Sequence, residues 1–147
     1  LVEKYRMDDA EIAFVAMGSV CGTIKVIIDK LREKGEKVGL LKLVCYRPFP
    51  KEAIVSALKD MKKVAVLEKA ISPGANGPVF EEIRSALYDS DKRPNLKNYI
   101  VGLGGRDVTF GNLKTIYGMI KGGKGKGIGK ENLTKMLPLP LPISLPS

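Results

Sequence analysis

The stretch Ile12-Ala-Phe-Val-Ala-Met17 is an uninterrupted apolar run that ends at Gly18-Ser19. It is too short for a typical helix and too uniformly apolar for a strand with one face in water, so it predicts a parallel strand buried on both faces. The period then changes. Apolar residues recur at the i, i+3, i+4, i+7 spacing of an amphipathic helix, at Ile24, Ile27, Ile28 and Leu31. Gly35 follows, where a glycine often ends a helix.

The same change of period recurs along the chain. Further strands are predicted at residues 38–45, 64–67 and 99–101. The helical stripes that follow them are Ile54, Ala57, Leu58 and Met61; Val79, Ile83, Ala86 and Leu87; and Leu113, Ile116, Tyr117 and Ile120. Successive strand-then-helix units predict a three-layer α/β fold, in which a mainly parallel sheet of four or five strands carries helices on both faces. The favoured order is second, first, third, fourth strand, with a topological switch point beside the first.

The two ends of the chain differ from this domain, which we expect to span residues 11–121. Residues 1–10 are charged and weakly patterned, and they fit either a linker or an edge strand. Residues 122–147 turn to glycine and lysine and then to alternating proline, which predicts a flexible extension. The chain starts with Leu rather than Met, and we expect it to be a piece of a longer polypeptide.

Composition excludes several classes of function. The 147 residues include 25 Lys and Arg against 16 Asp and Glu, a net charge of +9, and no His. Without histidine there is no Ser-His or Cys-His pair and no histidine-ligated zinc, and two cysteines cannot hold a four-cysteine iron–sulfur cluster. No apolar run approaches the roughly 20 residues of a membrane span, so we expect a cytoplasmic protein with no membrane partner. We expect no nucleic-acid partner, because no aromatic residues interleave with the lysines of the extension.

Ligands of open α/β sheets collect at the loops that follow the strands. The first loop, Gly18-Ser19-Val20-Cys21-Gly22, either presents backbone amides to an anion at a helix N-terminus or, as we favour, permits a tight turn. Cys21 is either a reactive thiol with a lowered pKa or, as we also favour, a small buried residue like Cys45. A redox switch that joins the two thiols is a further, less favoured hypothesis.

The other loops carry polar residues of candidate function. In Tyr46-Arg47-Pro48-Phe49-Pro50, the arginine either faces a partner or an anion, or pairs with a carboxylate such as Glu68 or Asp107. Glu68 ends the third strand and opens a connection of about ten residues that includes Asn76, a length typical of a binding loop. The fourth loop combines three glycines with Arg106 and Asp107, and Asp107 or Thr109 is alternatively a helix N-cap.

Four motifs occur in order at these loops: Val-Ala-Met-Gly-Ser, Tyr-Arg-Pro-Phe-Pro, Val-Leu-Glu-Lys-x-Ile-Ser-x-Gly and Gly-Leu-Gly-Gly-Arg-Asp-Val-Thr. With them, residues 5–121 resemble the C-terminal domain of the alpha chain of pyruvate:ferredoxin oxidoreductases, also called pyruvate synthases. The last motif is the most specific. The resemblance implies a transketolase C-terminal-like domain, whose mixed sheet often includes an antiparallel edge strand.

The resemblance also implies a larger enzyme, which uses thiamine diphosphate and magnesium to decarboxylate a 2-oxoacid, passes electrons through iron–sulfur clusters to ferredoxin, and transfers the acyl group to CoA. In that family the cofactors lie mainly in other domains and subunits. This chain is therefore expected to be inactive alone, with no catalytic, cofactor-binding or metal-binding residue, and to support assembly. The candidate interface or anion-facing residues are Ser19, Arg47, Glu68, Asn76, Arg106 and Asp107.

Two questions stay open at this point. The motifs favour pyruvate over a branched-chain 2-oxoacid but do not decide between them. The rival hypothesis is a free-standing flavodoxin-like module that binds a phosphorylated small molecule at the turn Gly18–Gly22.

Overall fold

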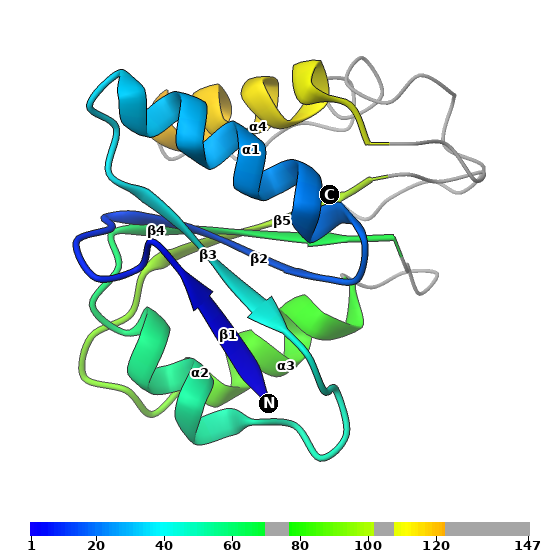
Figure 1. The fold of residues 1–147 in the computed structure, drawn as a ribbon. Helices are drawn as coiled ribbons and strands as arrows, with labels where there is room; N and C mark the ends of the chain where they lie inside the picture. Colours follow the sequence, from blue (N-terminus) through cyan, green and yellow to red (C-terminus); the bar gives the residue numbers. More distant parts are fainter. Residues whose placement is uncertain (70–76, 102–107, 123–147) are drawn as a thin grey trace.

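A computed structural model describes residues 1–69, 77–101 and 108–122, in which strands and helices alternate (Figure 1). The strands are β1 (Val2–Tyr5), β2 (Ile12–Met17), β3 (Val38–Leu43), β4 (Lys63–Glu68) and β5 (Asn95–Ile100). The helices are α1 (Val20–Glu33), α2 (Lys51–Leu58), α3 (Pro78–Leu87) and α4 (Phe110–Gly122). The predicted helical stripes lie on these helices, apart from Met61, which follows α2.

The strands form one sheet in the order β1-β3-β2-β4-β5. β3, β2, β4 and β5 run parallel, and β1 pairs with β3 in the antiparallel direction. Counted among the parallel strands alone, the order is second, first, third, fourth, so the predicted order is confirmed. The antiparallel edge strand is the one that the family resemblance implies.

Helices cover both faces of the sheet. Figure 1 shows α1 and α4 on one face and α2 and α3 on the other. In β2, Phe14 and Ala16 belong to the apolar cluster under α1 and α4, whereas Ala13 and Val15 belong to the cluster under α2 and α3. None of the four is more than 1% exposed. Because successive side chains of a strand point to opposite faces, a strand covered on both sides is apolar throughout, as predicted for residues 12–17.

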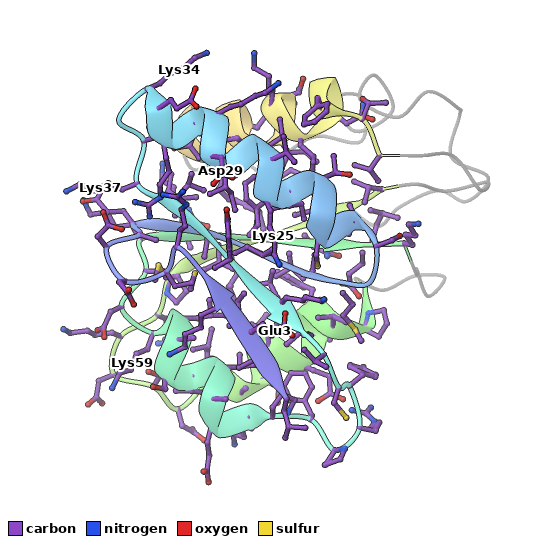
Figure 2. The ribbon with its side chains drawn as sticks, in the orientation of Figure 1. Glu3, Lys25, Asp29, Lys34, Lys37 and Lys59 are labelled. Atoms are coloured by element: carbon purple, nitrogen blue, oxygen red, sulfur yellow. The ribbon has the colours of Figure 1, made fainter. Side chains whose placement is uncertain are left out.

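Side chains fix the edge strand to α1. The Tyr5 hydroxyl donates a hydrogen bond to Asp29 at 2.7 Å, and the Arg6 guanidinium pairs with the same carboxylate at 3.0 Å. The Lys25 ammonium lies 5.3 Å from the centre of the Tyr5 ring, and Figure 2 shows Lys25 and Asp29 on α1 beside the strand. The strand itself is short and carries Glu3 and Lys4, features that blunt a free sheet edge.

Capping follows the sequence prediction at the end of α1 and at the start of α4. Gly35 has a φ of 84°, and the amide of Glu36 donates to the Leu31 carbonyl at 3.1 Å, which is the usual arrangement of a glycine-terminated helix. The Thr109 hydroxyl accepts a hydrogen bond from the Asn112 amide at 3.2 Å. Thr109 is therefore the N-cap of α4.

β5 differs most from the prediction, because it begins at Asn95 rather than at Tyr99. It pairs with β4 from the Lys63–Asn95 pair to the Glu68–Ile100 pair. Three of the first four residues of β5, Asn95, Lys97 and Asn98, are polar and none of the four is fully buried, so hydropathy gave no strand signal there. Backbone hydrogen bonds to β4, rather than buried apolar side chains, hold this part of β5 in the sheet.

Several predictions concern residues outside the described ranges. These are the candidates Asn76, Arg106 and Asp107, and all but the first residue of the extension at 122–147. The domain boundaries at 11 and 121 stay predictions. Among the described residues, no helix is both long and apolar enough to cross a membrane.

Candidate functional site at the carboxyl edge of the sheet

The carboxyl ends of the parallel strands meet at one edge of the sheet, on the right of Figure 1. From β2 the chain crosses to β3 on one side and then returns to β4 on the other side, so the switch point lies between β2 and β4. The candidate loops all follow these strand ends. Lys34, Lys37 and Lys59, labelled in Figure 2, lie toward the opposite edge.

Ser19 stands immediately before α1 and is exposed. Gly18 has a φ of 77°, a conformation that favours glycine. The amides of Cys21 and Gly22 donate to the carbonyls of Gly18 and Ser19, each at 3.2 Å, and the Ser19 side chain caps no amide. These contacts support the tight-turn interpretation, because two of the amides that an anion would use are already bonded.

Arg47 lies in the loop that follows β3, where an aromatic ring and an acidic side chain hold it. Its guanidinium lies 4.3 Å from the centre of the Tyr46 ring and donates to Glu82 at 2.9 Å. The Tyr46 ring in turn packs edge-on against Phe49, with 6.0 Å between the ring centres. The Arg47 side chain is 62% exposed, so its charge faces solvent in a restrained orientation.

Arg47 pairs with a carboxylate other than the two that the sequence suggested as its partners. Glu82 lies on α3, whereas the sequence offered Glu68, which is bonded elsewhere, or Asp107, which lies outside the described ranges. The hydrogen bond from Arg47 to Glu82 raises the pKa of the arginine. Because Glu82 is 35 residues away along the chain, no local pattern could identify it.

Glu68 is buried rather than presented to a partner, with 6% of its surface exposed. Its carboxylate accepts hydrogen bonds from the Val79 amide at 2.8 Å, from the Phe80 amide at 3.0 Å and from the Asn98 side-chain amide at 2.9 Å. Burial raises the pKa of Glu68, and these donors act against that rise. Glu68 therefore caps α3 from the end of β4, which corrects the expectation that it faces outward.

Asn98 and Gly77 complete this network, and sequence reasoning singled out neither. The Asn98 side-chain oxygen accepts from the Gly77 amide at 2.9 Å, and its nitrogen also donates to the Val66 carbonyl at 3.2 Å. A Cβ atom on Gly77 would overlap the Glu68 carboxylate. The pair Gly77-Pro78 before a helical stripe was the available signal, since proline is common in the first helical turn.

The two cysteines are free thiols. Cys21 is 2% exposed within α1, and burial raises the pKa of its thiol, which supports the buried-residue interpretation. Cys45 is half-buried, and its sulfur donates to the Arg47 carbonyl at 3.0 Å. Across the described ranges, no cluster of His, Cys, Asp or Glu side chains is suited to a metal ion.

A pocket of about 310 Å³ opens at the switch point beside the Glu68 network. Its described walls come from the ends of β2 and β4, the starts of α1 and α3, and the segments that follow β3 and β5. They include Met17, Val20, Tyr46, Leu67, Val79 and Val101. The lining is thus mainly apolar.

Residues 10–113 match the family model described as pyruvate:ferredoxin oxidoreductase core domain II. The chain belongs to this family. Pyruvate synthase subunit PorA of Thermotoga maritima is 52% identical over 107 residues, which cover 73% of this chain and 27% of that protein. Ketoisovalerate oxidoreductase subunit VorA of Pyrococcus furiosus is 47% identical over 116 residues, covering 79% of this chain and 29% of that protein. This core domain II chain therefore spans less than a third of the length of either relative.

Two solved structures share the fold. One is a 2-oxoglutarate:ferredoxin oxidoreductase from Magnetococcus marinus, with a TM-score of 0.58 and 18% identity over 83% of this chain and 19% of that one. The other is a split-gene transketolase, with a TM-score of 0.55 and 13% identity over 91% of this chain and 40% of that one. The expected α/β class, that of a transketolase C-terminal-like domain, is confirmed for core domain II.

Proposed function

We propose that this chain is core domain II of the alpha subunit of a pyruvate:ferredoxin oxidoreductase. The observation that carries the proposal is the family match over residues 10–113, joined to 52% identity with a pyruvate synthase subunit. The complete enzyme converts pyruvate, CoA and oxidised ferredoxin into acetyl-CoA, carbon dioxide and reduced ferredoxin. We favour pyruvate over a branched-chain 2-oxoacid as the substrate because of the Tyr-Arg-Pro-Phe-Pro and Gly-Gly-Arg-Asp-Val-Thr motifs.

The work of this domain is assembly rather than catalysis. Thiamine diphosphate, magnesium and iron–sulfur clusters belong to other domains and subunits of the enzyme. The sequence has two cysteines and no histidine, which does not fit a four-cysteine iron–sulfur cluster or a histidine-ligated metal, and Cys21 is buried inside α1. Ferredoxin and CoA are partners of the complete enzyme, which operates in the cytoplasm.

The carboxyl edge of the sheet is the surface that faces those domains and subunits. Ser19 and Arg47 are exposed there, and Asn76, Arg106 and Asp107 belong to the same proposed interface. An arginine stacked on an aromatic ring loses little side-chain freedom on binding, which suits it to a partner's carboxylate or to guiding an anionic substrate. Glu68 acts indirectly, by holding the start of α3.

The test compares Arg47→Ala with Arg84→Ala in the assembled enzyme. Arg84 is a matched control, because its guanidinium also lies over an aromatic ring, 5.7 Å from the centre of Phe80, and pairs with Glu81 at 2.7 Å. Both variants fold normally, since an exposed ion pair contributes no more than about 1 kcal/mol. We expect only Arg47→Ala to weaken subunit association or pyruvate-dependent ferredoxin reduction, by about tenfold.

Three measurements decide the outcome: sedimentation of the complex, KM for pyruvate and turnover. If Arg47→Ala and Arg106→Ala both left all three unchanged, the interface role would be wrong. A complex that reduced ferredoxin with 2-ketoisovalerate but not with pyruvate would correct the substrate and leave the family unchanged.

A further inference from the structure

The pocket at the switch point has a surface chemistry that differs from the charged rim around it. Its volume of about 310 Å³ is large enough for a bulky side chain or a small ligand. Met17 and Leu67 line it from the ends of β2 and β4, and Val79 lines it from the first turn of α3. Any occupant therefore makes mostly apolar contacts.

The pocket has few polar side chains with which to bind a metabolite. Among its described lining residues, those with polar side chains are Tyr46, Glu68 and Lys69. Both Glu68 oxygens already accept hydrogen bonds from α3 or Asn98, and the Tyr46 ring is covered by Arg47 and packed against Phe49. Sites for small polar molecules place several directed polar groups around the ligand. This pocket is better suited to an apolar protein side chain.

We propose that this pocket receives an apolar side chain from a part of the same subunit that lies outside this domain. The proposal rests on the proposed function, in which this chain is one domain of a longer subunit. More than two thirds of each relative lies outside the matched stretch, so the subunit has ample chain to supply the anchor.

A covalent link to this domain favours the same subunit, rather than a separate one, as the source of the anchoring side chain. A stable interface between separate chains buries on the order of 1,200 Å² or more, far beyond what a pocket for one side chain contributes. A segment joined covalently to the domain binds at a high effective concentration, so one buried anchor is enough to hold it. An apolar side chain that fills a desolvated pocket is the usual form of such an anchor.

The charge at the mouth of the pocket indicates which residues flank the anchor. Lys69 is exposed and lines the pocket, whereas the nearby Arg47 is already paired with Glu82. A cation beside an apolar pocket matches a segment in which an acidic residue flanks the apolar one. We therefore expect an anchor with Asp or Glu within a few positions.

The first experiment is photo-crosslinking in the native enzyme complex. p-Benzoylphenylalanine replaces Tyr46, whose ring already lines the pocket, or, as the control, Val55 in a hollow of about 370 Å³ between α2 and α3. After irradiation, mass spectrometry locates the crosslinked peptide. We expect the Tyr46 position to crosslink to the same subunit outside residues 1–147, at an apolar residue close to Asp or Glu, and the Val55 position not to do so.

Crosslinks to another subunit, to a second copy of this chain, or to residues 70–76 or 102–107 would each overturn the proposal, as would the absence of any crosslink. The two proposals can fail separately. If the complex is active but the crosslinks form elsewhere, only the anchor proposal is wrong. If the complex has no 2-oxoacid oxidoreductase activity, the proposed function is wrong, and so is the anchor proposal that rests on it.

A second variant measures the strength of the contact. Met17 is half-buried at the end of β2, so Met17→Trp can fill the pocket without entering the core, and Val55→Trp is the matched control. We expect Met17→Trp to release this domain from the subunit about tenfold faster during limited proteolysis, with Val55→Trp unchanged. Equal rates for the two variants would contradict the anchor.

Discussion

Replacing Gly77 by alanine tests how tightly Glu68 packs against the start of α3. Gly77 has a φ of −62° and a ψ of 147°, a backbone conformation that alanine adopts readily, so the substitution adds no backbone strain. The new Cβ would overlap the Glu68 carboxylate and lie 2.8 Å from its Oε1 atom. Since Glu68 is 6% exposed, it cannot simply turn into solvent, and the carboxylate or the first turn of α3 must shift.

The magnitude follows from the hydrogen bonds at risk. Glu68 accepts from the Val79 amide at 2.8 Å, the Phe80 amide at 3.0 Å and Asn98 at 2.9 Å. Each buried donor left without its acceptor costs about 1–3 kcal/mol. If one or two of these bonds are lost, the free energy of unfolding falls by about 2–4 kcal/mol, a large share of the roughly 5–15 kcal/mol that holds a domain folded.

The assay is urea unfolding of the chain followed by circular dichroism, with Gly118→Ala as the matched control. Gly118 lies inside α4, and a Cβ there would meet nothing within 4 Å. Alanine is favoured over glycine in a helix by about 0.5–1 kcal/mol, so this variant gains stability. The same change from glycine to alanine is thus expected to lower the free energy of unfolding at position 77 and to raise it at position 118. A Gly77→Ala midpoint equal to that of the parent chain would refute the packing argument.

Two further predictions concern the core. Gly39→Ala places a Cβ 2.6 Å from the Arg6 carbonyl oxygen, a contact that forces β3 away from the turn after β1; we expect a loss of about 2 kcal/mol by urea unfolding, and an unchanged midpoint would contradict the close approach. Burial raises the pKa of Tyr99 to about 12. Its neutral phenol therefore contributes stability that is complete below pH 10 and is lost as the pH rises toward 12, a change of roughly 2–3 kcal/mol. Burial also raises the pKa of Tyr117, so ultraviolet titration should show a late phenolate step whose amplitude falls by one tyrosine in Tyr99→Phe; an unchanged amplitude would refute the assignment.

The fold was predictable where helices cover the sheet on both faces. In β2 every position must exclude water, so the apolar run alone identifies a buried parallel strand. At the start of β5 the same reasoning failed, because Asn95 is exposed and Asn98 is half-buried and bonded to Glu68. A strand paired on one side tolerates polar side chains that reach neighbouring loops, and these erase the hydropathy pattern while the backbone ladder remains intact.

At the candidate site, the sequence predicted where the polar residues lie but not which residues they contact. Arg47 follows a strand end, and that position alone placed it at the carboxyl edge. Its pairing with Glu82 depends on how α3 lies beside the loop after β3, which no local spacing encodes. Glu68 was placed at the same edge for the same reason, yet its burial follows from α3 starting directly against β4.

The energetics of Glu68 connect this network to the pocket. Burial raises its pKa above the ordinary 4.5, so the group contributes stability that is complete below that value and is lost as the pH rises through the folded-state pKa. Above that pKa the ionised carboxylate costs free energy relative to the protonated form. Two consecutive amides of α3 and Asn98 converge on it, and an apolar side chain there would leave all of these donors unpaired. The carboxylate thus sets the position of the first turn of α3, and with it the Val79 wall of the pocket.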